Sequence, residues 1–198
     1  MNPTLLLVVL AAVVRPVSVP ETQKAVFAGG CFWGVDAVFR HAQGVVGVVS
    51  GYAGGSSATA QYDMVSSGST GHAEAVEISF DPQQISYGKL LEIFFTVAHD
   101  PTQLNRQGPD VGTQYRSVIF YTEEAQRQTA RGFIERLTRA NAFAAPIVTE
   151  LVPLVDFYPA ESYHQDYLAH HLTQPYIVYN DLPKLERLKD RFPALYRP

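Results

Sequence analysis

Lys24-Ala-Val-Phe-Ala-Gly-Gly-Cys31-Phe-Trp-Gly-Val-Asp-Ala-Val-Phe-Arg-His-Ala42 joins one short apolar run to a second through a pair of glycines. The spacing of apolar residues predicts a strand over residues 24–28 and a helix over residues 33–42, with a turn between them. Glycines let the backbone bend, and the first turn of a helix offers free N–H groups and the positive end of the helix dipole. Cys31 therefore stands at a strand-to-helix turn, and we expect this environment to favour the thiolate.

Cys31 is the only cysteine of the chain. A free cysteine has a pKa of about 8.5 and is only about 3% ionised at neutral pH, so a nucleophilic role requires such an environment. A small buried hydrophobe is the commoner fate of a lone cysteine. Phe32 and Trp33, the only tryptophan, favour instead an apolar cup around a reactive sulfur.

The composition is that of one globular domain. The chain has 198 residues, 46% of them hydrophobic and 17% charged, and its net charge of −4 offers no basic surface for nucleic acid. With one cysteine, no internal disulfide and no cysteine-rich zinc or iron–sulfur site can form. The histidines do not have the spacing of a metal motif either, and we expect no metal site.

An apolar run, Leu5–Val14, marks a leader over residues 1–22, and residues 23–198 form the expected catalytic domain. The run is too short to cross a membrane as a helix, and its length suits the core of a secretory signal. Export to the periplasm or beyond follows if the run is a signal peptide, and a cytoplasmic location otherwise. No Lys or Arg precedes the run, which leaves a non-functional leader or a misassigned start as alternatives.

The remaining chain alternates between strand and helix patterns. Strands are expected over residues 24–28, 44–52, 73–80, 115–121 and 147–152, and helices over residues 33–42, 87–98, 123–141, 163–171 and 182–192, the last with Asp181 as its N-cap. The first six elements have the order βαββαβ. This order predicts an α+β fold, a ferredoxin-like (split βαβ) two-layer sandwich, extended by a helix, a strand and a long C-terminal tail.

Two glutamates lie near the start of the strand expected over residues 73–80. Glu74 and Glu77 are three residues apart, so they point to opposite faces of a strand and one of them should face inward. A buried carboxylate is costly to keep ionised, so its pKa rises and it can donate a proton near neutral pH. A solvated glutamate on an edge strand is an equally good interpretation.

Other candidates have more than one interpretation. Asp110 and Tyr115 lie where a turn leads into a strand; Asp110 can simply shape the turn, and Tyr115 can be a core or rim aromatic. Tyr62 lies in a polar loop, where it either pins the loop or reaches into a site. Residues 161–167 bring titratable and phenolic groups together within two helical turns.

Four motifs follow one another along the chain: Gly30-Cys-Phe-Trp-Gly34, Gly71-His-Ala-Glu-Ala-Val76, Gly112-Thr-Gln-Tyr-Arg-Ser117 and Tyr163-His-Gln165. Together they resemble the A-type peptide methionine sulfoxide reductases, and the resemblance runs from about Lys24 to the C-terminus. It implies thiol-dependent reduction of the S epimer of methionine sulfoxide, free or in oxidised proteins. It also implies a role for each matching residue: Cys31 as nucleophile, Glu74 as acid, Tyr62 and Tyr115 as hydroxyls that hold the sulfoxide oxygen, Asp110 in a supporting role, and Phe32, Trp33 and His164 as substrate-binding residues.

The residues suit this chemistry. A sulfoxide sulfur is a poor electrophile until its oxygen is protonated, so a neutral acid and two phenols supply what a thiolate attack needs. The attack leaves Cys31 as a sulfenic acid, which a second thiol normally discharges. Residues 173–198 contain no cysteine, and Ser66 occupies a position that is often cysteine in the family. We therefore expect a one-cysteine enzyme that binds no cofactor and uses an external thiol, namely thioredoxin, glutaredoxin or a small thiol.

We expect a monomer without a stable membrane span. Two other functions remain open on the sequence. One is a hydrolase or acyltransferase in which Cys31 acts with a histidine and Asp110. The other is a binding module that captures methionine side chains at Phe32 and Trp33 without reducing them. Consumption of a sulfoxide separates the three functions.

Overall fold

The computed structural model describes residues 21–198, so the expected leader lies almost wholly outside the described residues. A six-stranded sheet has the order β7-β6-β1-β3-β2-β8, and a two-stranded hairpin, β4-β5, lies apart from it. The strands are β1 (Gln23–Gly29), β2 (Val45–Ala53), β3 (Ala73–Phe80), β4 (Arg106–Gln107), β5 (Asp110–Val111), β6 (Ser117–Tyr121), β7 (Glu150–Pro153) and β8 (Phe157–Pro159). All neighbouring pairs are antiparallel except β6 and β7, which are parallel.

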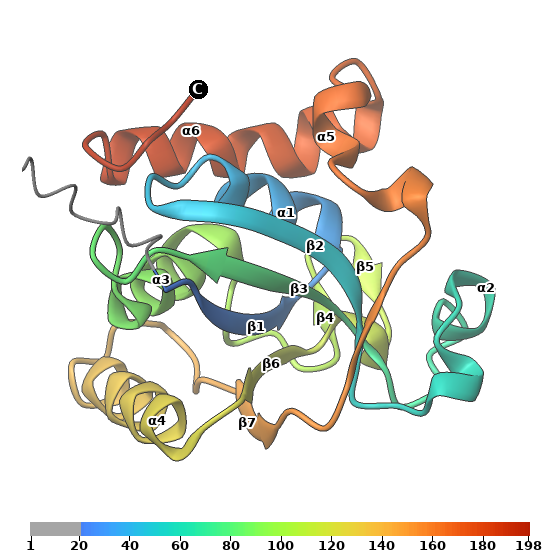
Figure 1. Ribbon diagram of the computed structural model, residues 1–198, viewed down its shortest axis with the longest axis horizontal. Coiled ribbons are helices and arrows are strands. Elements are labelled where there is room, and N and C mark those ends of the chain that lie inside the picture. The colour runs from blue at the N-terminus through green and yellow to red at the C-terminus, as the bar shows by residue number, and fades with distance from the viewer. Residues whose placement is uncertain (1–20) are drawn as a thin grey trace, which may run out of the picture.

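The described helices form one mixed α+β fold with the sheet (Figure 1). The α-helices are α1 (Phe32–Arg40), α2 (Tyr62–Val65), α3 (Tyr87–Ile93), α4 (Glu124–Arg139), α5 (Tyr167–His170) and α6 (Leu182–Arg191). Short 3₁₀ or π turns are η1 (Ser57–Thr59), η2 (Phe94–Ala98), η3 (Thr113–Tyr115), η4 (Ser162–His164) and η5 (Ile177–Asp181).

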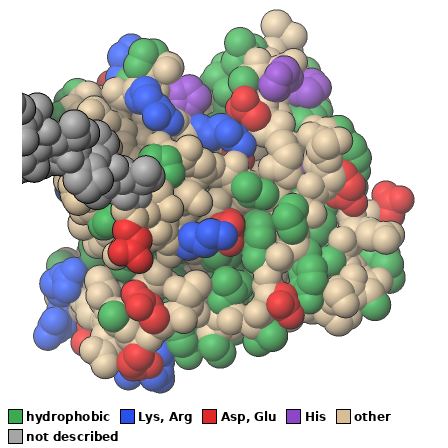
Figure 2. All heavy atoms as spheres, in the orientation of Figure 1, with side chains coloured by type: hydrophobic (Ala, Val, Ile, Leu, Met, Phe, Trp, Pro, Cys, Tyr) green, Lys and Arg blue, Asp and Glu red, His purple; other side chains and the backbone are tan. Residues whose placement is uncertain are grey.

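Strand β1 is apolar at every position from Ala25 to Ala28 because both of its faces are covered. On the face that carries α1 and α3, Phe27 packs against Phe39 and stacks on Phe94, with ring centroids 4.8 Å apart in the stacked pair. On the other face, a smaller apolar cluster is covered by the chain around Phe157. Figure 2 shows hydrophobic side chains gathered on this face. The end of β1 thus lies between two apolar clusters, and Cys31 belongs to the larger of them.

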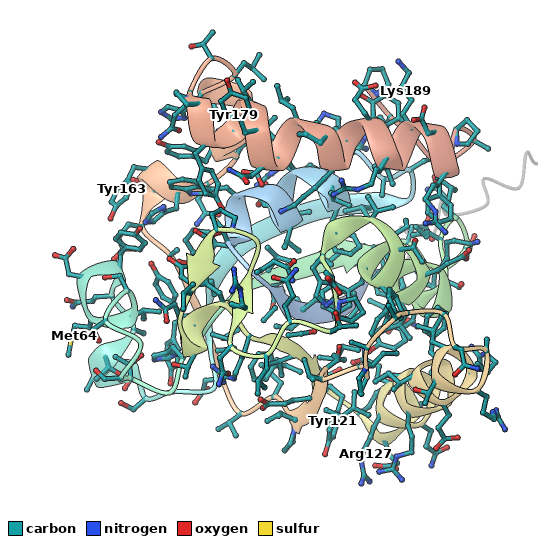
Figure 3. All side chains as sticks on the ribbon, turned by 180° about the vertical axis from the view of Figure 1, so that it is seen from behind. Met64, Tyr121, Arg127, Tyr163, Tyr179 and Lys189 are labelled. Atoms are coloured by element: carbon teal, nitrogen blue, oxygen red, sulfur yellow. The ribbon has the colours of Figure 1, made fainter. Side chains whose placement is uncertain are left out.

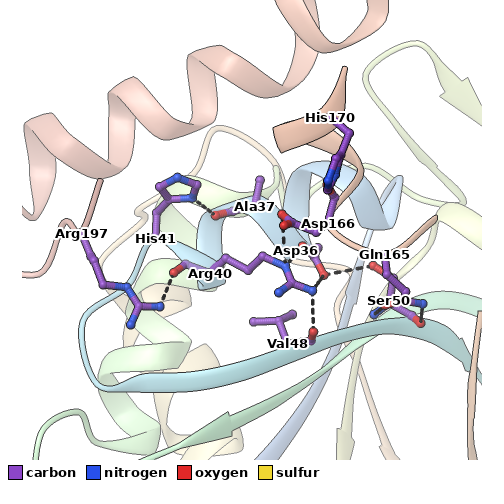
Figure 4. Close-up of polar contacts among 10 residues, drawn as sticks. All are labelled: Asp36, Ala37, Arg40, His41, Val48, Ser50, Gln165, Asp166, His170 and Arg197. Atoms are coloured by element: carbon purple, nitrogen blue, oxygen red, sulfur yellow. Dashed lines mark hydrogen bonds and ion pairs between the residues drawn. The ribbon is translucent and has the colours of Figure 1, made fainter. Parts of the chain in front are cut away.

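Polar contacts fasten the segment after β8 to α1 and β2 (Figure 4). Arg40 of α1 pairs with Asp166 at 3.6 Å and with Asp36 at 2.5 Å, and it donates to the carbonyl oxygen of Val48 at 2.7 Å. The Gln165 carboxamide accepts from the backbone N–H of Ser50 at 2.9 Å and donates to its carbonyl oxygen at 2.9 Å. These contacts hold the chain around residue 165 against the sheet.

Four expected elements differ from the structure. The strand expected from residue 115 begins at Ser117, because residues 113–115 form the turn η3 after Gly112, whose φ is 148°. The helix expected over residues 87–98 changes to a π turn at Phe94. The strand expected over residues 147–152 begins later in the structure, where β7 spans Glu150–Pro153.

The helix expected over residues 163–171 is interrupted, because Gln165 has an extended backbone and Asp166 a left-handed one with φ of 51°. Asp181 makes no side-chain cap to α6; its carboxylate accepts from Lys184 at 3.1 Å instead. Gln165 instead bonds to the backbone of Ser50, 115 positions away, whereas Lys184 is only three positions from Asp181.

Candidate active site

Cys31 occupies the N-cap position of α1, directly after a turn that only glycine fits easily. Gly30 has φ of 94°, and a Cβ atom there would meet the side chain of Gln107. The Cys31 side chain is 8% exposed and is a free thiol. The turn therefore places the sulfur at the first turn of a helix with a small opening to solvent.

Glu74 is the inward one of the two glutamates. It lies on β3 on the same face as Val76 and Ile78, and it is 2% exposed. Its Oε2 atom accepts the backbone N–H of Phe32, the residue after the cysteine, at 3.0 Å. Glu77 faces the other way and pairs with Lys24 at 2.7 Å. Strand alternation and the N-terminus of α1 together hold the Glu74 carboxyl beside Cys31.

Burial shapes the charges of this pair. It raises the pKa of Glu74 to about 8, although the Phe32 N–H opposes the shift. Burial, together with the negative charges of Glu74 and Asp181, raises the pKa of the Cys31 thiol well above its ordinary value. The expectation that the turn favours a thiolate is therefore wrong for the free protein, in which burial first, and nearby negative charges second, favour the thiol. The two groups titrate as a coupled pair, because ionisation of one opposes ionisation of the other.

Two phenols share this environment. Tyr62 begins α2 rather than lying in a loop, and burial followed by the charges of Glu74 and Cys31 raises its pKa to about 12. Tyr115 ends η3, and the same three causes raise its pKa above the ordinary value. Both hydroxyls thus keep their protons at neutral pH and can donate hydrogen bonds near the sulfur.

The expected apolar cup divides into two parts. Phe32 is buried and packs against Tyr52 and His164. Trp33 is half-buried, stacks on Tyr167 with ring centroids 3.8 Å apart, and donates its indole N–H to Nδ1 of His164 at 3.1 Å. Burial lowers the pKa of His164, so at neutral pH the ring is neutral. With Nδ1 accepting, the proton is on Nε2, a buried donor without a protein partner among the described residues.

Two residues of this site were not among the expected site residues. Tyr176 donates its hydroxyl to Asp110 at 2.5 Å, and its ring meets Trp33 edge-on. Burial raises the pKa of Asp110, and the Tyr176 hydrogen bond lowers it. Glu161 accepts the backbone N–H of Tyr62 at 2.9 Å and the hydroxyl of Tyr52 at 2.8 Å, which fixes the start of α2. Glu161 belongs to the polar cluster over residues 161–167, whereas nothing local marked Tyr176.

The arrangement brings a thiol, a protonated carboxylic acid and two neutral phenols to one place. All eight expected site residues lie around it. Within residues 21–198, no group of three or more His, Cys, Asp or Glu side chains is placed to hold a metal ion. Over the same residues, no helix has the length and hydropathy that a membrane span requires.

Known proteins match the chain over most of its length. A model of the family described as peptide methionine sulfoxide reductase matches residues 23–195. The peptide methionine sulfoxide reductase MsrA 2 of Mesorhizobium japonicum is 56% identical over 177 residues, which are 89% of this chain and 91% of that protein. MsrA 2 of Synechocystis sp. is 51% identical over 90% of this chain and 85% of its own. Among solved structures, reduced Mxr1 of Saccharomyces cerevisiae superposes with a TM-score of 0.73 at 33% identity, covering 78% of this chain and 88% of that one.

Proposed function

Since this chain belongs to the peptide methionine sulfoxide reductase family, we propose that it reduces the S epimer of methionine sulfoxide, free or in oxidised proteins, to methionine. It is an oxidoreductase, and the reaction repairs oxidised proteins. The observation that carries the proposal is the contact between Glu74 and the backbone N–H after Cys31, because a buried carboxyl group beside a thiol suits a proton donor beside a nucleophile.

The reaction begins with attack of the Cys31 thiolate on the sulfoxide sulfur. Glu74 delivers a proton to the sulfoxide oxygen, and the hydroxyls of Tyr62 and Tyr115 donate hydrogen bonds to the same oxygen. The S–O bond of the substrate breaks, methionine leaves, and Cys31 keeps the oxygen as a sulfenic acid. The reactive state therefore has its proton on Glu74 and none on Cys31.

The aromatic residues bind the substrate. Trp33 contacts the methyl group, with Phe32 at the base of the pocket. His164 fixes the indole through its hydrogen bond to the Trp33 N–H. Asp110 acts in support of the site, held by Tyr176.

An external thiol restores the enzyme, because the chain has no second cysteine. Thioredoxin, glutaredoxin and small thiols are the candidate reductants, and no cofactor is bound. We also propose that the enzyme acts as a monomer, that residues 23–198 form one domain and that residues 1–22 are a leader. The ferredoxin-like class is supported by the antiparallel order β6-β1-β3-β2, with α1 and α3 on one face.

The test is a turnover assay with each sulfoxide epimer and dithiothreitol. We expect the S epimer to be consumed and the R epimer to remain. Hydrolysis of esters or amides would instead indicate the hydrolase, and binding without consumption would indicate the binding module. The geometry opposes the hydrolase, since no histidine of residues 21–198 donates to or accepts from Cys31; His72 and His99 bond elsewhere.

A further inference from the structure

Helix α2, which carries Tyr62, has little apolar packing to hold it in place. It is a single turn long, and Val65 is its only buried residue. Figure 3 shows α2 at the margin of the molecule, where Met64 is labelled, and Met64 is 41% exposed. The position of α2 therefore depends on polar contacts at its two ends. At the first end, Glu161 accepts the backbone N–H of Tyr62.

At the second end, the side chain of Gln114 ties α2 to η3. Its carboxamide donates to the carbonyl oxygen of Ser66 at 3.0 Å. Ser66 in turn closes the helix, since its backbone N–H donates to the carbonyl oxygen of Tyr62 at 2.8 Å. Gln114 directly precedes Tyr115 in the chain. Two hydrogen bonds and one peptide bond thus connect the residues that carry the two phenols.

The surrounding chain leaves room for the Gln114 carboxamide and little else. Gln114 is 4% exposed, a Cβ atom at Gly112 would collide with its Oε1 atom, and a Cβ atom at Gly68 would lie 3.0 Å from the same oxygen. Oε1 is buried and has no hydrogen-bond partner among the described residues. A buried oxygen without a partner costs stability, so an apolar side chain of the same length would serve the fold at least as well. The amide group is therefore better explained by what its N–H holds than by stability.

We propose that Gln114 is a positioning residue for the reduction of methionine sulfoxide, which sets the separation of the Tyr62 and Tyr115 hydroxyls by tying α2 to η3. The inference rests on the proposed function, in which both hydroxyls donate to the sulfoxide oxygen. It goes further by naming the contact that makes them converge on that oxygen. The exposed Thr113 supports this contact, because its hydroxyl donates to the carbonyl oxygen of Gly68 at 2.6 Å.

A shared acceptor makes the placement of the two hydroxyls demanding. A hydrogen bond between oxygens is about 2.5–3.0 Å long and weakens steeply when its geometry is poor. Tyr62 and Tyr115 come from separate segments, and both are only partly buried, so core packing alone does not fix them. If α2 moves relative to η3, one hydroxyl loses its bond to the sulfoxide oxygen. Stabilisation of the transition state then falls, while binding in the aromatic pocket is kept.

The experiment measures methionine release in a single turnover at saturating S sulfoxide. Gln114→Met keeps the length of the side chain and removes the amide donor. The rate should fall roughly 10- to 100-fold, with little change in the affinity for the sulfoxide. Gln126→Met is the matched control, because Gln126 is also a buried glutamine that donates to a distant backbone carbonyl, that of Lys24, at 2.7 Å. It lies on α4, away from the site residues, and its variant should release methionine at the wild-type rate.

A second comparison separates positioning from a general loss of structure. The double variant Tyr62→Phe/Tyr115→Phe lacks both hydroxyls, so its release is already slow. Adding Gln114→Met to it should slow release by less than about twofold, because nothing remains for Gln114 to position. Thr113→Val removes only the supporting contact, at an exposed residue where misfolding is not expected. It should slow release in the wild-type background and not in the double variant.

The outcomes are distinct. The inference would be overturned by an equal loss in both backgrounds, by a loss in Gln126→Met as large as in Gln114→Met, or by wild-type release from a folded Gln114→Met enzyme. If Gln114→Met does not fold, Thr113→Val decides, and its release at the wild-type rate would overturn the inference as well. A wild-type enzyme that releases no methionine would instead contradict the proposed function.

Discussion

Glu74→Gln tests the acid directly, because it removes the proton and little else. Glutamine has nearly the same shape, and its amide oxygen can still accept the N–H of Phe32, which lies 3.0 Å from the carboxylate. With a pKa of about 8, Glu74 is mostly protonated at neutral pH and able to donate. Loss of a positioned general acid lowers a rate by roughly 10²- to 10⁴-fold, or about 3–5 kcal/mol in the barrier.

The assay is methionine release in a single turnover, measured across pH. In the wild type, Glu74 and Cys31 hold two protons below pH of about 8 and one proton in an interval above it. The reactive state belongs to the one-proton form, so the rate should rise as pH passes through about 8. In Glu74→Gln the rate should be low at every pH. Any increase of that rate with pH then reflects deprotonation of the Cys31 thiol alone.

Glu77→Gln is the matched control on the same strand. Glu77 faces away from the site and pairs with the exposed Lys24, an interaction worth less than about 1 kcal/mol. Its single-turnover rate should equal that of the wild type. A folded Glu74→Gln enzyme that releases methionine at the wild-type rate would refute the role of the acid.

Three further predictions concern the sulfur and its pocket. Cys31→Ser should abolish reduction of the S sulfoxide, since a serine hydroxyl is a far weaker nucleophile than a thiolate; retained activity in the turnover assay would contradict the assignment. Trp33→Ala should weaken substrate binding by roughly 1–3 kcal/mol through lost apolar contact, measured as an affinity with circular dichroism as a check of folding; unchanged affinity would place the indole outside the pocket. Without reductant, the enzyme should release about one methionine per molecule and gain the mass of one oxygen, which thiol removes; an unmodified mass after release would exclude the sulfenic acid.

The sequence predicted features that depend on local pattern. The strand over residues 73–80 has the bounds expected from its alternation, and the same alternation shows that only one of Glu74 and Glu77 can face inward. The α+β class follows from the order of elements. Which glutamate faces inward was left open, because the choice depends on where β3 lies in the sheet and on the position of α1.

Features that depend on distant segments were not predictable. The pKa of Cys31 is set by burial and by Glu74 and Asp181, none of which the local turn reveals. Asp181 holds the N-cap position of α6 as expected, but its side chain is fully buried and accepts from Lys184 instead of capping a backbone N–H. Tyr176 is joined to Asp110, 66 positions away in the sequence, so no local spacing marks it.

The contacts of Gln165 and Arg40 also affect the behaviour of strand β2 at the edge of the sheet. β8 pairs with only three residues of β2, Gly51–Ala53, and the Gln165 carboxamide takes the place of a neighbouring strand at Ser50. Arg40 donates a hydrogen bond to the carbonyl oxygen of Val48. An open edge with free N–H and C=O groups invites pairing with another polypeptide and aggregation. Two side chains therefore shield this edge from strand addition by another polypeptide, including the oxidised proteins on which the enzyme acts.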